Sequence, residues 1–280
     1  MTVAQLDIVK QTTLAERLFK IALWGFVGSI VFSVAGTLLL KLAPSLMTVF
    51  GPYYPQLVKT PTWTYMTLLP LLPVLMYSRS LGWRRMAFFV VWGSVIGGVS
   101  ELIGTTTGFP FGAYTYTQWL GPKLFEHVPY FIPLSWFAMS IISLDLARRL
   151  TPNRWPRILL ATVFMTLWDV SLDPAMSKAF PFWIYPDGGF FYGMPASNWA
   201  GWLGVSFVII AGYEYLAGGL KSTHRWAPEV YALNCAFPLS ISLLYGLYGA
   251  FIIGLLAAAL PLLLLWRRGR LVVHDEPGAV

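Results

Sequence analysis

The chain has 280 residues and a formal net charge of +7, with 57% hydrophobic residues and only 11% charged ones. Soluble domains carry about 25% charged residues, so this composition excludes an ordinary soluble fold and indicates an integral membrane protein. Basic residues mainly set the orientation of such a protein, so the charge does not indicate a nucleic acid partner. The single cysteine excludes an internal disulfide framework and a cysteine-rich metal site.

Apolar runs long enough to cross a bilayer recur along the chain. The first follows a cytoplasmic lead-in at 1–19, and it is too long for a signal peptide and lacks a clean cleavage motif. The second holds Pro70 and Pro73 and is expected to be kinked. In chain order the predicted spans are 20–43, 62–78, 86–104, 131–148, 156–172, 199–219, 228–246 and 248–266. Residues 1–280 are therefore expected to form a single, all-α, polytopic transmembrane bundle of about eight spans, or seven if the last two merge.

The lysines and arginines test this arrangement and its orientation. With eight spans and both termini in the cytoplasm, 15 of the 19 basic residues lie in inner segments, including a cytoplasmic tail at 267–280. The four outside are Lys41, Lys59, Lys123 and Lys178. The positive-inside rule supports this orientation, in the inner cell membrane. The loops 105–130 and 173–198 then lie together on the outer side, and both are rich in glycine, proline and aromatic residues.

Three acidic residues are placed where spans reach the outer side, and acids inside spans are candidates for function. Glu101 ends the third span, and Asp169 and Asp173 end the fifth. The i, i+4 spacing puts the two aspartates on one helical face, and Pro174 predicts that the helix stops at Asp173. Repulsion between buried carboxylates favours one protonated and one ionised group, which together form a general acid/base pair. The alternative is that these acids cap or solubilise helix ends, although acids at a helix C-terminus oppose the macrodipole.

Other residues of the spans have simpler expected roles. Asp145 and Glu214 lie near inner helix ends and are expected to pair with neighbouring arginines. Gly93, Gly97 and Glu101 follow one another at four-residue steps. Small residues on one stripe let a second helix approach closely, so Glu101 is expected to face the bundle rather than lipid.

Aromatic residues are concentrated in the two outer loops. An interfacial aromatic belt explains part of this enrichment, and the remainder is expected to line a slot for a long apolar substrate. Aromatic faces also stabilise a cation, and Asn198 either orients water or caps a helix. The predicted substrate-binding residues are Phe109, Phe111, Tyr114, Trp136, Trp168, Tyr192, Asn198 and Trp202.

Motifs for cofactors and metals are absent from the sequence. The three histidines are scattered, no GxGxxG opens a helix, and no DDxxD-type cluster is present to hold a magnesium diphosphate. The later spans carry no central lysine for a retinal Schiff base. The sequence therefore predicts cofactor-free and metal-free acid/base chemistry on an apolar molecule.

Four segments together carry a family resemblance: "ELIGTTTGFPFGAYTYTQWLGP", "VPYFIPLSWFAM", "WDVSLDPAM" and "YGMPASNWAGW". Over about residues 60–265 the chain resembles the integral-membrane carotenoid 1,2-hydratases, of the γ-carotene 1′,2′-hydratase and bisanhydrobacterioruberin hydratase type. The resemblance implies addition of water across the C1=C2 bond of an acyclic ψ-end group, as in γ-carotene or lycopene, to give a tertiary alcohol. Asp169 or Asp173 would protonate C2, aromatic faces would stabilise the carbocation, and Glu101 would take the complementary role.

Two other functions stay open at this point. One is a non-catalytic membrane protein that binds carotenoid or lipid, and the other is a proton-coupled transporter. A transporter usually places its ionisable groups near the midplane, whereas these acids gather at one interface. The expected partners are an apolar carotenoid from the bilayer, water, membrane lipids and other enzymes of the carotenoid pathway, and no nucleic acid.

Overall fold

The computed structural model describes residues 3–271. The predicted tail beyond Leu271 and the first two residues of the predicted lead-in lie outside the described residues.

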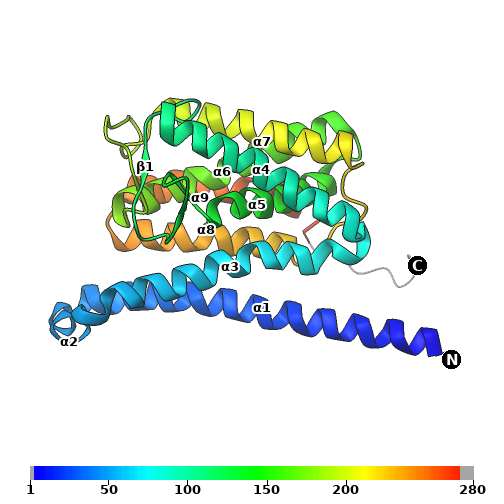
Figure 1. The fold of residues 1–280 in the computed structure, drawn as a ribbon, viewed down its shortest axis with the longest axis horizontal. Coiled ribbons are helices and arrows are strands. Elements are labelled where there is room, and N and C mark those ends of the chain that lie inside the picture. The colour runs from blue at the N-terminus through cyan, green and yellow to red at the C-terminus, as the bar shows by residue number, and fades with distance from the viewer. Residues whose placement is uncertain (1–2, 272–280) are drawn as a thin grey trace.

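Eight long helices form the body of the protein, and each of the eight predicted spans coincides with one of them (Figure 1). They are α1 (Val3–Leu42), α3 (Tyr54–Leu81), α4 (Trp83–Thr107), α5 (Phe131–Leu150), α6 (Arg154–Pro174), α7 (Ala196–Leu216), α8 (Ala227–Leu244) and α9 (Tyr248–Arg267). Between α1 and α3 lie the short helices η1 (Pro44–Leu46), α2 (Met47–Phe50) and η2 (Gly51–Tyr53). The all-α membrane bundle is confirmed.

Five helices of the described chain are long and apolar enough to cross a membrane by length and composition: α1 from Leu14, α4, α5, α6 with its extension to Ala179, and α9. The count of eight spans stays a prediction. The helices run back and forth, so the start of α1 and the end of α9 lie at one end of the bundle (Figure 1). The acids of α4 and α6 lie near the opposite end, which we call the loop end because the connections 108–130 and 180–195 cover it.

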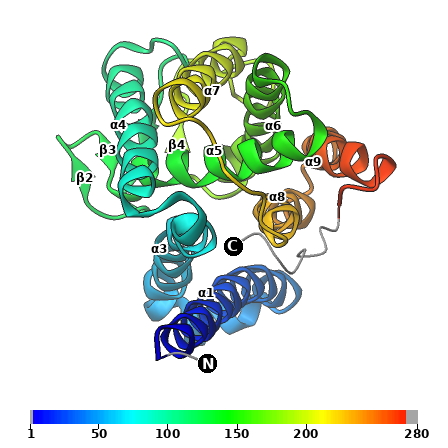
Figure 2. The ribbon, with the colours of Figure 1, turned by 90° about the vertical axis from the view of Figure 1, so that its right-hand side faces the viewer.

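Helix α5 lies inside the bundle, whereas the α1–α3 hairpin lies along one side of it (Figure 2). Of the most apolar window in α5, 78% of residues are buried, compared with 22% in α1. A helix that is apolar around its whole circumference belongs in a core or a membrane, and α5 takes the core position. The exposed apolar residues of α1 are those expected of a helix that faces lipid.

The two connections at the loop end are joined by backbone pairing. Strand β1 (Thr115–Tyr116) pairs antiparallel with β4 (Trp183–Ile184), with Tyr116 opposite Trp183. The backbone N–H of Thr117 extends this pairing by donating to the Phe182 carbonyl at 2.9 Å. A second small hairpin, β2 (Lys123–Leu124) with β3 (Val128–Pro129), lies within the first connection. The two loops therefore form one cover over the ends of α4 and α6.

The prediction that a helix stops at Asp173 is wrong. Helix α6 runs through Pro174 and continues as a single π-helical turn, Ala175–Ala179, closed by a bond from the Phe180 N–H to the Ala175 carbonyl at 2.9 Å. Proline lacks the N–H that an α-helix needs at this position, and the widened turn absorbs the irregularity without ending the helix.

Two helix starts also differ from the prediction. Helix α1 begins at Val3, so the described part of the predicted lead-in is helical; no glycine or proline interrupts the chain between Val3 and Gly25. Helix α3 begins at Tyr54 and passes through Pro61, Pro70 and Pro73.

The small-residue stripe of α4 packs against α5, as expected. A Cβ atom added to Gly97 would lie 2.4 Å from the ring of Trp136, and one added to Gly93 would lie 2.9 Å from the Cα atom of Phe137. Glycine at both positions therefore permits a backbone approach that any side chain would prevent. One turn further along, this contact places Glu101 beside Trp136.

Candidate active site

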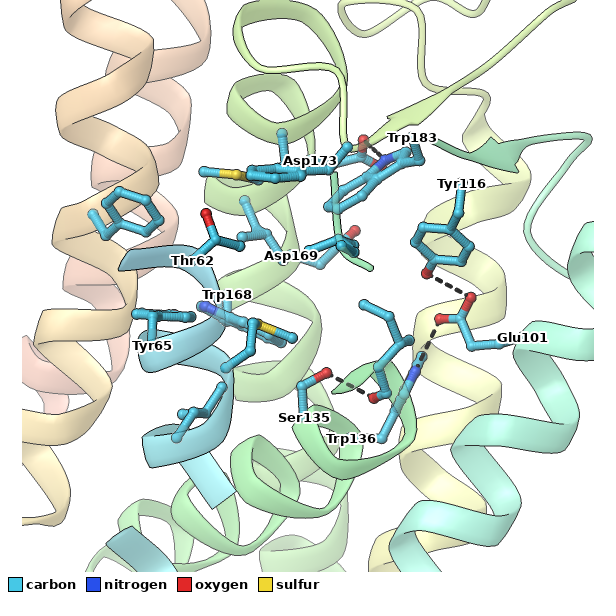
Figure 3. Close-up of a pocket in the computed structure, with 18 of the residues that line it drawn as sticks. Thr62, Tyr65, Glu101, Tyr116, Ser135, Trp136, Trp168, Asp169, Asp173 and Trp183 are labelled. Carbon is cyan, nitrogen blue, oxygen red and sulfur yellow. Dashed lines mark hydrogen bonds between the residues drawn. The ribbon is translucent and has the colours of Figure 1, made fainter. Parts of the chain in front are cut away.

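Three buried carboxylates border one cavity near the loop end of the bundle (Figure 3). Glu101 comes from the last two turns of α4, and Asp169 and Asp173 come from the end of α6; their exposed fractions are 5%, 1% and 1%. The cavity holds about 90 Å³ of free space. That is several times the space a single water molecule needs, so the cavity has room for more than one water-sized group.

Three side chains donate hydrogen bonds to the carboxylate of Glu101. Tyr116 donates its hydroxyl to Oε2 at 2.8 Å, Trp136 donates its indole N–H to Oε1 at 2.9 Å, and Tyr114 donates its hydroxyl to Oε2 as well. Burial, reinforced by the negative charge of Glu101, raises the pKa of both Tyr114 and Tyr116 well above the ordinary value, so both phenols remain protonated. Hydrogen bonds of this kind stabilise the ionised form of a carboxyl group.

Three side chains also donate hydrogen bonds to the carboxylate of Asp173. The Trp183 indole donates to Oδ1 at 2.9 Å, the Tyr185 hydroxyl donates to Oδ2 at 2.6 Å, and the Asn198 amide donates to Oδ2 at 3.0 Å. Burial and the nearby aspartates raise the pKa of Tyr185 well above its ordinary value, so it stays a donor. Like Glu101, Asp173 is therefore surrounded by groups that favour its ionised form.

Asp169 differs from the other two acids. Among the described residues one donor reaches its carboxyl group, the Asn198 amide, which lies 3.0 Å from Oδ2. The same amide bonds Asp173, so Asn198 bridges the two aspartates that share one face of α6. The N-terminus of α7 has no side-chain cap, so the alternative that Asn198 serves as a helix cap is wrong. Asp169 is buried, accepts one hydrogen bond and lies near two carboxylates that each accept three. It is therefore the acid best suited to carry a proton.

Tryptophan rings form the wall between the acids. The rings of Trp136 and Trp202 are stacked with their centroids 4.1 Å apart, and Trp168 meets Trp202 edge-on at 5.7 Å. None of the described residues that line the cavity is lysine, arginine or histidine. Aromatic faces and carboxylates without a basic partner provide a site that stabilises a positive charge on an apolar molecule.

The opposite wall comes from the α1–α3 hairpin. Thr62 and Tyr65 of α3 face the cavity (Figure 3), together with Ser29 and Ser33 of α1. The Tyr65 hydroxyl donates to Oδ1 of Asn234 on α8 at 2.6 Å, which holds the ring in place.

A family model described as carotenoid biosynthesis protein matches residues 62–261, which is well over half of the chain. The chain belongs to this family of carotenoid biosynthesis proteins. It is also 36% identical, over 134 residues, to a curated protein of Haloarcula japonica, bisanhydrobacterioruberin hydratase. The match covers 46% of this chain and 45% of that relative, so it spans about half of the relative's length. No solved structure matches the chain.

The structure brings all three predicted acids, Glu101, Asp169 and Asp173, to the lining of one cavity. Six of the eight predicted binding residues line the cavity as well: Phe111, Tyr114, Trp136, Trp168, Asn198 and Trp202.

The other two predicted substrate-binding residues, Phe109 and Tyr192, lie outside the lining of this cavity. Phe109 follows the left-handed Gly108 that ends α4, and this turn directs its ring outward, leaving it 73% exposed. Tyr192 packs over Gly249 at the start of α9, and its hydroxyl accepts a bond from the Ala250 N–H at 3.1 Å. Both residues lie in loops, where no regular periodicity determines whether a side chain points toward the cavity or away from it.

Three important donors were not selected from the sequence: Tyr116, Trp183 and Tyr185. A signal was present for one of them, because Tyr114 and Tyr116 are two residues apart, and side chains two apart in an extended segment point the same way. Trp183 and Tyr185 are also two residues apart, so one extended segment turns both toward Asp173, but it is the pairing between β1 and β4 that brings this segment to the site.

The inner acids have the structural role that the sequence predicted. Asp145 pairs with Arg149 at 2.8 Å, and Glu214 pairs with Arg157 at 2.6 Å. Both pairs lie at the end of the bundle opposite the cavity. Among the buried acids of the described residues, this leaves Glu101, Asp169 and Asp173 without a basic partner.

Proposed function

We propose that this protein adds water across the C1=C2 bond of an acyclic ψ-end group, in a carotenoid such as lycopene or γ-carotene, to form a tertiary alcohol at C1. Membership of the carotenoid biosynthesis family and the hydratase name of the relative support the reaction class. The observation that carries the proposal is the unequal number of hydrogen-bond donors around the three acids. Glu101 and Asp173 each accept from three donors, and Asp169 accepts from one.

Asp169 is the general acid in this proposal. Its proton moves to C2, the π electrons form the new C–H bond, and C1 becomes a tertiary cation. Trp136, Trp168 and Trp202 surround this position with aromatic faces, and the ionised Glu101 and Asp173 add negative charge. The buried, apolar walls keep bulk water from competing with the single water that reacts.

Glu101 is the general base. A lone pair of the water forms the C1–O bond, and a proton of the resulting oxonium moves to Glu101. Return of that proton from Glu101 to Asp169 through water completes the cycle, with one water added and no redox change. Asp173, joined to Asp169 through Asn198, holds the proton on Asp169 between turnovers by charge repulsion. The substrate enters from the bilayer, with the loop end on the outer side of the inner cell membrane and both termini in the cytoplasm.

Pigment analysis tests this proposal against simple carotenoid binding. The protein is expressed in a host that accumulates lycopene or γ-carotene, and the extracted pigments are analysed by mass. A new pigment heavier by one water, labelled when the cells grow in H₂¹⁸O, supports hydration. Unchanged pigment in cells that contain well-expressed, membrane-inserted protein indicates a binding protein instead.

A further inference from the structure

A second, larger hollow adjoins the acid cavity. It has a volume of about 430 Å³ and lies between the α1–α3 hairpin and α8. The two spaces share wall residues, among them Ser33 of α1, Thr62 of α3 and Phe237 of α8. They are therefore adjacent and meet at these shared side chains. We call the larger hollow the groove, and the two spaces together the path.

The groove is apolar for most of its length. Its lining consists mainly of aliphatic and aromatic side chains, and Lys41 is the one charged residue among the described residues that line it. The Lys41 ammonium lies 4.0 Å from the centroid of the Tyr245 ring at the loop end of α1. An apolar path with a single cation at its far end suits a long hydrocarbon that starts in the acid cavity.

The path is also long and open on one side. Ser29 lines the acid cavity and Lys41 lines the groove, and these residues are separated by about 18 Å along α1 at the usual helical rise. Phe32 and Leu39 line the groove and are nevertheless 51% and 50% exposed. The groove thus opens onto the face of α1 that is directed to lipid.

We infer that this groove binds the polyene body of the same carotenoid whose ψ end enters the acid cavity, while the far end remains in the bilayer. The inference rests on the proposed function for the identity of the ligand. The occupant follows from adjacency, because an isoprenoid chain that reaches the acids has this apolar hollow directly beside it. A protein that does not enclose the far end accepts lycopene and γ-carotene alike, and it hydrates a molecule with two ψ ends in two separate binding events.

Gly36 provides a way to block the groove without disturbing the protein. It lines the groove, and a Cβ atom added there would meet no atom within 4 Å. The substitution Gly36→Phe therefore fills the groove rather than the protein core. Gly28, on the same helix, is equally open and lines neither space, so Gly28→Phe is the matched control.

The test measures lycopene retained per protein after purification into nanodiscs, for both substitutions in the wild-type and Asp169→Asn backgrounds. We expect Gly36→Phe to lower retention by roughly tenfold, the effect of losing the burial of about two methylene groups of the polyene, and Gly28→Phe to leave it unchanged. Equal retention of lycopene by the two variants overturns the inference. It is also overturned if Gly36→Phe loses a bound phospholipid while it retains the pigment. Retention does not depend on turnover, so a protein that binds through the groove but never hydrates contradicts the proposed function alone.

Discussion

At the scale of single residues, hydrogen bonding distinguishes three acids that the sequence presents as equivalent. Tyr114, Tyr116 and Trp136 surround Glu101, whereas Asp169 shares a single amide with Asp173. An ionised carboxylate accepts several strong hydrogen bonds, whereas a protonated carboxyl group needs fewer donors around it. The environment of each acid therefore assigns its role in the proposed reaction.

Removal of a donor from a proposed ionised acid should slow the reaction without abolishing it. Hydrogen bonds to charged groups contribute about 1.5–3 kcal/mol, so Tyr116→Phe and Tyr185→Phe should each lower kcat by roughly ten- to a hundredfold. Tyr192→Phe is the control, because its hydroxyl lies outside the cavity on Ala250. Initial rates of hydrated pigment in isolated membranes provide the measurement. Equal rates for Tyr116→Phe and Tyr192→Phe would remove the donors from the mechanism.

Sequence and structure agree most closely where local periodicity determines the outcome. The i, i+4 spacing of Asp169 and Asp173 fixes their common face in any helix. The same spacing predicts that Gly93, Gly97 and Glu101 share one face of α4. The donors Trp183 and Tyr185 depend on pairing of β1 with β4, some 70 residues apart in the chain. The wall built by α1 and α3 depends on packing between helices. Neither kind of contact leaves a local pattern in the sequence.

At the scale of elements, the close contact of α4 with α5 sets the position of Glu101. Gly97 allows the Trp136 ring to lie against the α4 backbone, and the indole of Trp136 then donates to Glu101. The joined cover of β1 and β4 supplies the remaining tyrosine and tryptophan donors from above. Glu101 therefore receives its hydrogen bonds from α5 and the cover, whereas the two aspartates of α6 receive theirs from the cover and from Asn198 of α7.

A side chain at Gly97 should disturb this contact. Gly97→Leu would place its Cβ atom 2.4 Å from the Trp136 ring, and overpacking of this kind costs about 1–3 kcal/mol. We expect a lower melting temperature in detergent together with loss of hydration. Gly204→Leu on α7 is the control, since a Cβ atom there meets nothing within 4 Å. If both variants melt and react as the wild type does, the close approach of α4 and α5 is not required.

At the scale of the whole molecule, the three buried acids without basic partners and the two joined loops gather at one end, and the inner ion pairs lie at the other. The orientation predicted from the basic residues places the loop end outside and both termini in the cytoplasm. An apolar substrate then reaches the acids sideways from the bilayer, along the face of α1, rather than through the cover.

Cysteine labelling of intact cells tests this orientation. The native Cys235 is buried and should not react, whereas the exposed side chain in Phe109→Cys should react with an impermeant maleimide applied from outside. Ser222→Cys, in the exposed connection at the opposite end, should react only after the cells are opened. Labelling of Ser222→Cys in intact cells, with Phe109→Cys protected, would reverse the orientation.

The most direct test of the central claim is the mass of the pigment made by Asp169→Asn beside that made by the wild type in a lycopene-producing host. The account predicts a product heavier by one water from the wild type, and unchanged lycopene from equally abundant, membrane-inserted Asp169→Asn. Asparagine keeps the size of the side chain and its amide contact but supplies no acidic proton, so the loss would be chemical rather than structural. Full conversion by Asp169→Asn, or no hydrated pigment from the wild type, would contradict the account.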